Sequence, residues 1–194
     1  MAVDPQGNDL QSVRIPITGK IAWAPLDAAN VVTPADGGDR SLALLTDYPA
    51  YKLLGLIKTD GGFEPTAETG DATEFFQDGY KLFGESTLSE KVGLAQSDRS
   101  LVEFLTGKTF DANGHIYVSD AFTDKQFLIF REVLYKSGDI ERRNGVAQFT
   151  EVAQDKDERG TVRGFAVAYE WQRSDLFGGE KYSQWDLPVV AVGS

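Results

Sequence analysis

The stretch KQFLIFREVLYK (residues 125–136) is apolar on both faces of the β-strand that it predicts. Alternate side chains of a strand point to opposite sides of a sheet. Its two faces would carry Phe127, Ile129 and Val133 on one side, and Leu128, Phe130 and Leu134 on the other. Such a strand must be covered on both sides, by a second sheet, by a helix or by another subunit.

Much of the remaining chain shows the same alternation. We expect long strands over 86–96, 146–154 and 161–172, the last with Phe165, Val167, Tyr169 and Trp171 on one face. Shorter strands are expected over 13–25 (two, around Gly19), 51–61 and 116–119, and a hairpin over 73–84 turning at Asp78-Gly79. Further turns are expected at 137–139 and at Asn144-Gly145.

One short segment, LAQSDRSLVEFLTGK (94–108), predicts a helix over about 98–106. Ser97 would cap its N-terminus, with Ser100 and Glu103 as an alternative capping box, and Gly107 would end it. Two helical turns are marginal in isolation, so the helix must lie on a sheet. The predicted fold is an antiparallel β-sandwich or partly rolled barrel with one short flanking helix.

The expected organisation is one sandwich domain between two arms. Residues 1–12 would form a flexible N-terminal arm, and 13–172 the sandwich, which includes a long loop over 26–50. Residues 173–194 would form a C-terminal arm whose Trp185 docks on its own subunit or on a neighbour.

Composition limits the function more than any motif does. The chain has 194 residues, no cysteine and a net charge of −11, so disulfides and thiolate–metal sites are excluded. The acidic balance disfavours simple adhesion to nucleic acid or to an anionic membrane. No run approaches the ~20 apolar residues that span a bilayer. No signal peptide is visible, which predicts a soluble protein made in the cytoplasm.

Residues for catalysis or metal binding are few. His115 is the single histidine and lies in a Gly-rich turn, where a solvated loop histidine is the favoured interpretation over a catalytic base. The acidic runs DGGD (36–39) and DKDE (155–158) lack the ligand spacing of a calcium loop. A glycosidase needs two suitably spaced carboxylates, and the sequence singles out no pair. We expect no enzyme activity, cofactor or metal.

Aromatic residues allow a second interpretation. Trp23, Phe75, Phe76, Tyr80 and Trp171 could line a sugar-binding groove. Most of them fall at strand period, so packing in the core is favoured.

Several segments, taken in order, resemble the major tail proteins of long-tailed phages, especially phages of actinobacteria. These segments are IAWAP (21–25), YKLLGLIKTDG (51–61), EFFQDGYKLFGESTLSEKVGLAQ (74–96) and VRGFAVAYEWQ (162–172). The resemblance covers about residues 20–172 and rests on the collinear order more than on any single motif.

The resemblance implies a structural virion protein. Six subunits would form a ring, and the rings would stack into a tail tube. The implied partners are other copies of the chain, a tape-measure protein in the lumen, and tail terminator and tail tip proteins. DNA would pass through without specific binding, and an acidic lumen would repel its phosphates. Glu90, Arg131, Glu132 and Trp185 are candidate lumen or subunit-interface residues.

Three alternatives remain, two from other classes and one a related viral β-sandwich component. One is a non-catalytic β-sandwich that binds carbohydrate through exposed aromatic residues. Another is a glycosidase with an unrecognised carboxylate pair. A third is a head–tail connector, which would form a single ring and not a tube.

Overall fold

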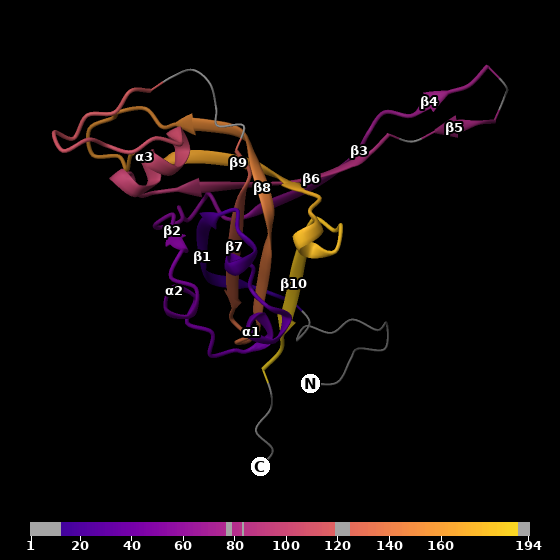
Figure 1. The fold of residues 1–194 in the computed structure, drawn as a ribbon, viewed down its shortest axis with the longest axis horizontal. Helices are drawn as coiled ribbons and strands as arrows, with labels where there is room; N and C mark the ends of the chain where they lie inside the picture. The colour runs from indigo at the N-terminus through magenta and orange to yellow at the C-terminus, as the bar shows by residue number, and fades with distance from the viewer. Residues whose placement is uncertain (1–12, 77–78, 83, 119–124, 190–194) are drawn as a thin grey trace, which may run out of the picture.

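The computed structural model describes residues 13–76, 79–82, 84–118 and 125–189, and the predicted N-terminal arm (1–12) lies outside this part of the chain. The described chain is mainly antiparallel β-structure, as the alternating sequence predicted (Figure 1). Its strands are β1 (Pro16–Pro25), β2 (Lys52–Leu53), β3 (Glu64–Thr69), β4 (Thr73–Glu74), β5 (Lys81–Leu82), β6 (Ser86–Leu94), β7 (Phe127–Tyr135), β8 (Ile140–Gln154), β9 (Phe165–Gln172) and β10 (Tyr182–Leu187). Its helical segments are η2 (Ala28–Asn30), α1 (Pro34–Gly38), α2 (Leu44–Asp47), α3 (Arg99–Thr106) and η3 (Asp175–Phe177).

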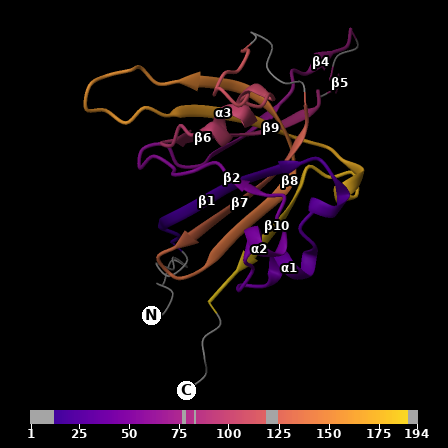
Figure 2. The ribbon, with the colours of Figure 1, turned by 60° about the vertical axis from the view of Figure 1, so that its left-hand side comes forward.

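Strand β8 belongs to both layers of the fold. Its first part, 140–147, pairs with β7 on one edge, and β10 pairs along 140–145. Its second part, 146–154, pairs with β9, which in turn pairs with β6. The strand order is β2-β1-β7-β8-β9-β6-β3, with β10 beside β8. The described strands therefore form a sandwich-like arrangement that is not closed into a barrel (Figure 2).

The main hydrophobic core lies between the two layers and under α3. The four residues predicted to share a face of β9 are all buried in it: Phe165, Val167, Tyr169 and Trp171. From α3, Phe104 stacks on Trp23 with ring centroids 4.4 Å apart and meets Phe127 at 4.8 Å. The helix is thus held by aromatic packing against β1 and β7, as its short length requires.

Helix α3 begins and ends through identifiable caps. Asp98, and not Ser97, is the N-cap, because its Oδ1 accepts a hydrogen bond from the Leu101 N–H at 2.8 Å. Gly107 ends the helix in the left-handed region at φ +65°, as predicted.

A second core covers the opposite face of β7. Residues 26–50, predicted as a long loop, fold as η2, α1 and α2 over Leu128, Phe130 and Val146. The prediction that β7 is covered on both sides is therefore confirmed. The chain covers the second face with its own residues.

The predicted turn at Asn144-Gly145 is wrong, because β8 runs through it without interruption. The Asn144 side chain is fully buried and accepts a hydrogen bond from the Val32 N–H at 3.0 Å. Its amide donates to the Tyr51 hydroxyl at 2.8 Å and to the Ile129 carbonyl at 2.9 Å. The side chain ties the covering segment to the sheet, and this tertiary role overrides the local turn preference.

Other elements also differ from the sequence predictions. Residues 16–25 form one strand, β1, and not two around Gly19. In 51–61 only Lys52–Leu53 is a strand, and none is present over 116–118. The predicted C-terminal arm is ordered into the fold as far as β10, which pairs with β8.

A two-stranded ribbon leaves the sandwich and carries β4 and β5 at its far end (Figures 1 and 2). We call this feature the ribbon and define it as residues 64–76, 79–82 and 84–88. At its base β3 pairs with β6, and further out Thr73 pairs with Leu82 and Glu74 with Lys81. Every residue of β3, β4 and β5 is exposed.

Candidate functional site

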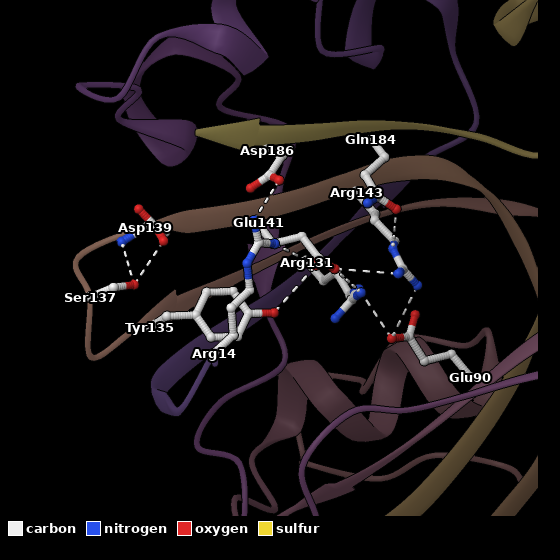
Figure 3. A network of polar contacts seen from close by, with 10 residues as sticks. All are labelled: Arg14, Glu90, Arg131, Tyr135, Ser137, Asp139, Glu141, Arg143, Gln184 and Asp186. Carbon is white, nitrogen blue, oxygen red and sulfur yellow. Dashed lines mark hydrogen bonds and ion pairs between the residues drawn. The ribbon is translucent and has the colours of Figure 1, made fainter. Parts of the chain in front are cut away.

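The predicted candidates Glu90 and Arg131 form an ion pair between the two layers of the sandwich (Figure 3). Glu90 lies on β6 and is 1% exposed; Arg131 lies on β7 and is 4% exposed. The Arg131 Nε lies 3.1 Å from the Glu90 Oε1, and the Tyr169 hydroxyl donates to the Glu90 Oε2 at 3.0 Å. Burial raises the pKa of the Glu90 carboxyl, against the attraction of Arg131 and Arg143.

This pair continues into a chain of charges that reaches the surface. Arg131 Nη2 donates to Glu141 Oε1 at 2.6 Å, and Arg143 Nη2 lies 3.3 Å from the same atom. Further out, Arg14 Nη2 donates to Asp186 Oδ2 at 2.5 Å. Arginines and carboxylates alternate along the network, so it is balanced in charge. The network connects β6, β7, β8 and β10 by ion pairs, and its geometry favours this structural role over the binding of a free ion.

The predicted candidate Glu132 faces the opposite side of β7 and holds a second buried arginine. Arg142 is 1% exposed, and its Nε donates to the Glu132 Oε2 at 2.6 Å. Its Nη1 donates to the carbonyls of Gly37 at 2.9 Å and Asp39 at 2.5 Å. Arg142 therefore fastens the C-terminal end of α1 to the sheet. Sequence reasoning missed this residue, because its partners are backbone carbonyls distant in the chain.

Trp185 lies on β10 and docks on its own subunit. Its Nε1–H donates to the Pro34 carbonyl at 3.1 Å, and its ring lies where a side chain at Gly37 would stand. A glycine is required at that position because a Cβ would approach the ring to 2.2 Å.

None of these four candidates stands free on the subunit surface. Glu90 and Arg131 are interior residues, and Glu132 and Trp185 are partly buried against the covering segment. The structure places Glu90 and Arg131 in the interior of the subunit. The physical reason is that each has its counter-charge within the same chain, because Glu90 pairs with Arg131 across the sandwich and Arg131 also pairs with Glu141 on the adjacent strand β8.

The remaining polar candidates lie apart from one another. His115 is exposed in the turn 111–115, where its N–H donates to the Asp111 Oδ1 at 2.8 Å. In the ranges that the structure describes, no three His, Asp or Glu side chains gather closely enough to hold a metal ion. No described helix is long and apolar enough to cross a membrane.

The surface does carry unpartnered apolar features that sequence reasoning only partly identified. The first is the outer edge of β1. Strand β2 pairs only with Ala22 and Trp23, so 16–20 have no strand neighbour on that side among the described residues. Ile17 is 59% exposed here, and Val13 and Ile15 nearby are also exposed.

The second feature is the tip of the ribbon, where the large apolar side chains Phe75, Phe76, Tyr80 and Leu82 are all exposed. The prediction that Phe75, Phe76 and Tyr80 pack in the core is therefore wrong, whereas it is confirmed for Trp171 and holds in part for Trp23. Alternation shows which residues share a face, but it does not show whether that face is covered.

The third feature is a groove of about 470 Å³ between the start of β7, the end of β1 and α3. We call it the aromatic groove. Trp23, Phe104 and Phe127 line it. Three lysines, Lys52, Lys108 and Lys125, and one acid, Glu103, stand around it.

No protein-family model and no curated protein matches the sequence. The class of the chain is therefore given by its fold alone, which is that of a mainly antiparallel, sandwich-like β-protein.

Proposed function

We propose that this chain is the structural subunit of a phage tail tube, whose copies join into hexameric rings that stack into a conduit for DNA. It has no catalytic role in this proposal. The ordered resemblance of 20–172 to major tail proteins supports the phage assignment. The physical support is a surface suited to contact with further copies of the same chain.

The observation that carries this proposal is the open edge of β1. An exposed strand edge presents unpaired N–H and C=O groups and is a template for pairing with another chain. Here the edge is flanked by Val13, Ile15 and Ile17, each more than half exposed. The two faces of β7, in contrast, are covered by the chain itself. Assembly through strand edges would bury this apolar margin and add ladder hydrogen bonds.

The net charge of −11 is compatible with a DNA conduit, because carboxylates facing a lumen would repel phosphate. The tape-measure protein, tail terminator and tail tip proteins are the partners that this role implies. The subunits would be made in the host cytoplasm, and the tube that they form would be part of the virion tail.

The test is negative-stain electron microscopy of the purified protein over a concentration series, with light scattering on the same samples. We expect rings or hollow tubes of uniform width. Ile17→Lys should raise the concentration at which they appear about tenfold, which corresponds to about 1.4 kcal/mol per contact. Val162→Lys changes a similarly exposed apolar residue of a loop and should have no effect. A wild-type protein that stays monomeric throughout the series contradicts the proposal.

A second candidate, a carbohydrate-binding module, is favoured by the exposed rings of Phe75, Phe76 and Tyr80, because sugars stack on aromatic faces. Binding of a monomer to a glycan array, lost in Tyr80→Ala, would support it. Absence of glycan binding together with tubes in the microscope would exclude it.

A further inference from the structure

The tip of the ribbon is exposed apolar surface that the described part of its own subunit leaves uncovered. Phe76 is fully exposed, and Phe75, Tyr80 and Leu82 are each more than half exposed. The two strands of the tip meet at only two residue pairs, Thr73–Leu82 and Glu74–Lys81. A two-stranded hairpin of this kind is marginally stable in water. A clustered apolar tip on a projecting element is typical of a contact site.

The aromatic groove has the size and lining to receive such a tip. Its volume of about 470 Å³ lies within the range of about 300–1,000 Å³ that is usual for ligand pockets. The rings of Trp23 and Phe104 stack at 4.4 Å, and Phe127 stands edge-on to Phe104. A phenylalanine entering the groove would therefore meet a fixed aromatic wall, which favours edge-to-face packing.

Charge distinguishes this pairing from other apolar contacts. The described part of the ribbon carries five acids, Glu64, Glu68, Asp71, Glu74 and Glu85, and one lysine, Lys81. The groove carries the opposite balance, with Lys52, Lys108 and Lys125 against Glu103. Complementary potentials at the rim of an apolar contact select the partner and speed the encounter.

The ribbon and the groove cannot meet within one subunit. Along the long axis of the molecule, the tip of the ribbon lies at one end and α3, which lines the groove, at the other (Figure 1). The occupant that matches the groove in shape and charge is therefore the ribbon of a second copy. A contact between two different surfaces of identical chains is heterologous, so it repeats into a ring or a filament.

We propose that the ribbon of one copy inserts Phe76 into the aromatic groove of the next copy, against the stacked rings of Trp23 and Phe104 and beside Lys52, Lys108 and Lys125. This inference rests on the proposed function, since it names one of the contacts through which the subunits assemble. Phe76 is the apolar anchor, the acids of the ribbon and the lysines of the groove fix the orientation, and the contact is separate from the open edge of β1.

The experiment compares two variants alone and mixed. Phe76→Ser removes the anchor, and the double variant Lys52→Glu/Lys108→Glu makes the groove repel the ribbon. Each alone should assemble only at about tenfold higher concentration than wild type, as followed by light scattering and analytical ultracentrifugation. Val162→Ser, a similarly exposed residue outside both surfaces, is the matched control and should behave as wild type.

The mixture gives the decisive result. The groove variant keeps an intact ribbon and Phe76→Ser keeps an intact groove, so a 1:1 mixture should associate at a lower concentration than either variant alone. Circular dichroism should show both variants folded. If wild type assembles but Phe76→Ser assembles equally well, or the mixture gives no gain, this inference is overturned while the proposed function stands. If wild type never assembles, the proposed function itself fails.

Discussion

Two phenylalanines, Phe130 on β7 in the sandwich and Phe76 just beyond β4 at the tip of the ribbon, have opposite surroundings. Phe130 is fully buried between Tyr51 and the sheet, because 26–50 folds over that face of β7. Phe76 is fully exposed, because nothing in the described part of its own subunit reaches the tip of the ribbon. The described chain thus covers both faces of β7 with its own residues and leaves the apolar tip of the ribbon exposed.

The largest effect in this comparison of buried and exposed phenylalanines is expected at Phe130. Phe130→Ala should lower the free energy of unfolding by about 3–5 kcal/mol, since it removes a buried ring and leaves a cavity under the covering segment. Urea denaturation of the monomer, followed by tryptophan fluorescence, measures the loss. A change below about 1 kcal/mol would mean that residues 26–50 do not hold this face closed.

A slightly smaller effect is expected at the arginine that fastens the covering segment. Arg142→Met should cost about 3 kcal/mol, because Glu132 loses a buried counter-charge and the carbonyls of Gly37 and Asp39 lose their donor. Hydrogen exchange should then show faster exchange over 33–40 than over β9. Equal acceleration in both regions would contradict a local fastening role.

Glu90 gives a prediction in the pH dependence of stability. Its folded pKa is raised by burial, so the folded state binds its proton more tightly than the unfolded state does, and ionisation of Glu90 reduces stability as pH rises. Glu90→Gln cannot ionise and should gain stability relative to wild type from about pH 4.5 upward, levelling off above the folded pKa. Denaturation of both proteins at a series of pH values measures the difference. A difference that is constant with pH, or falls as pH rises, would contradict a raised pKa.

The smallest effect on the isolated subunit is expected at Phe76. Phe76→Ala should change the free energy of unfolding of the monomer by less than about 0.5 kcal/mol, since nothing in the described part of its own subunit covers the ring. The same substitution is then costly in the sandwich and nearly free on the ribbon. A loss as large as that of Phe130→Ala would show that the ribbon tip packs on its own subunit.

The sequence was sufficient to predict the structure where a residue pattern is compatible with only one arrangement. The double apolar face of 125–136 requires two covers, the alternation of 165–171 requires a core, and Gly107 suits a left-handed helix end. It was insufficient where contacts with residues distant in the chain determine the local structure. Asn144-Gly145 has the local signature of a turn, but buried hydrogen bonds to Val32, Tyr51 and Ile129 keep it in a strand.

The candidate residues show the same limit. A carboxylate at the buried position 90 is visible in the sequence as an interruption of an apolar face, but its partner Arg131 lies across the sandwich and could not be identified from spacing. Trp185 looked like part of an irregular tail, because β10 is only half covered and shows no clean alternation. The exposed tip of the ribbon was missed because aromatic residues at strand period usually mark a core.

Sharing one strand between two layers also governs when a newly made chain can fold. Strand β1 cannot pair with β7, nor β6 with β9, until the later strand has been synthesised. Neither layer can therefore form from contiguous sequence as the chain leaves the ribosome. Only after β8 has been synthesised can β7 and β9 be joined, and β10 completes the set last. Such high contact order slows folding and prolongs the exposure of unpaired strands. The sheet of the described residues can therefore be completed only after β10 has been synthesised.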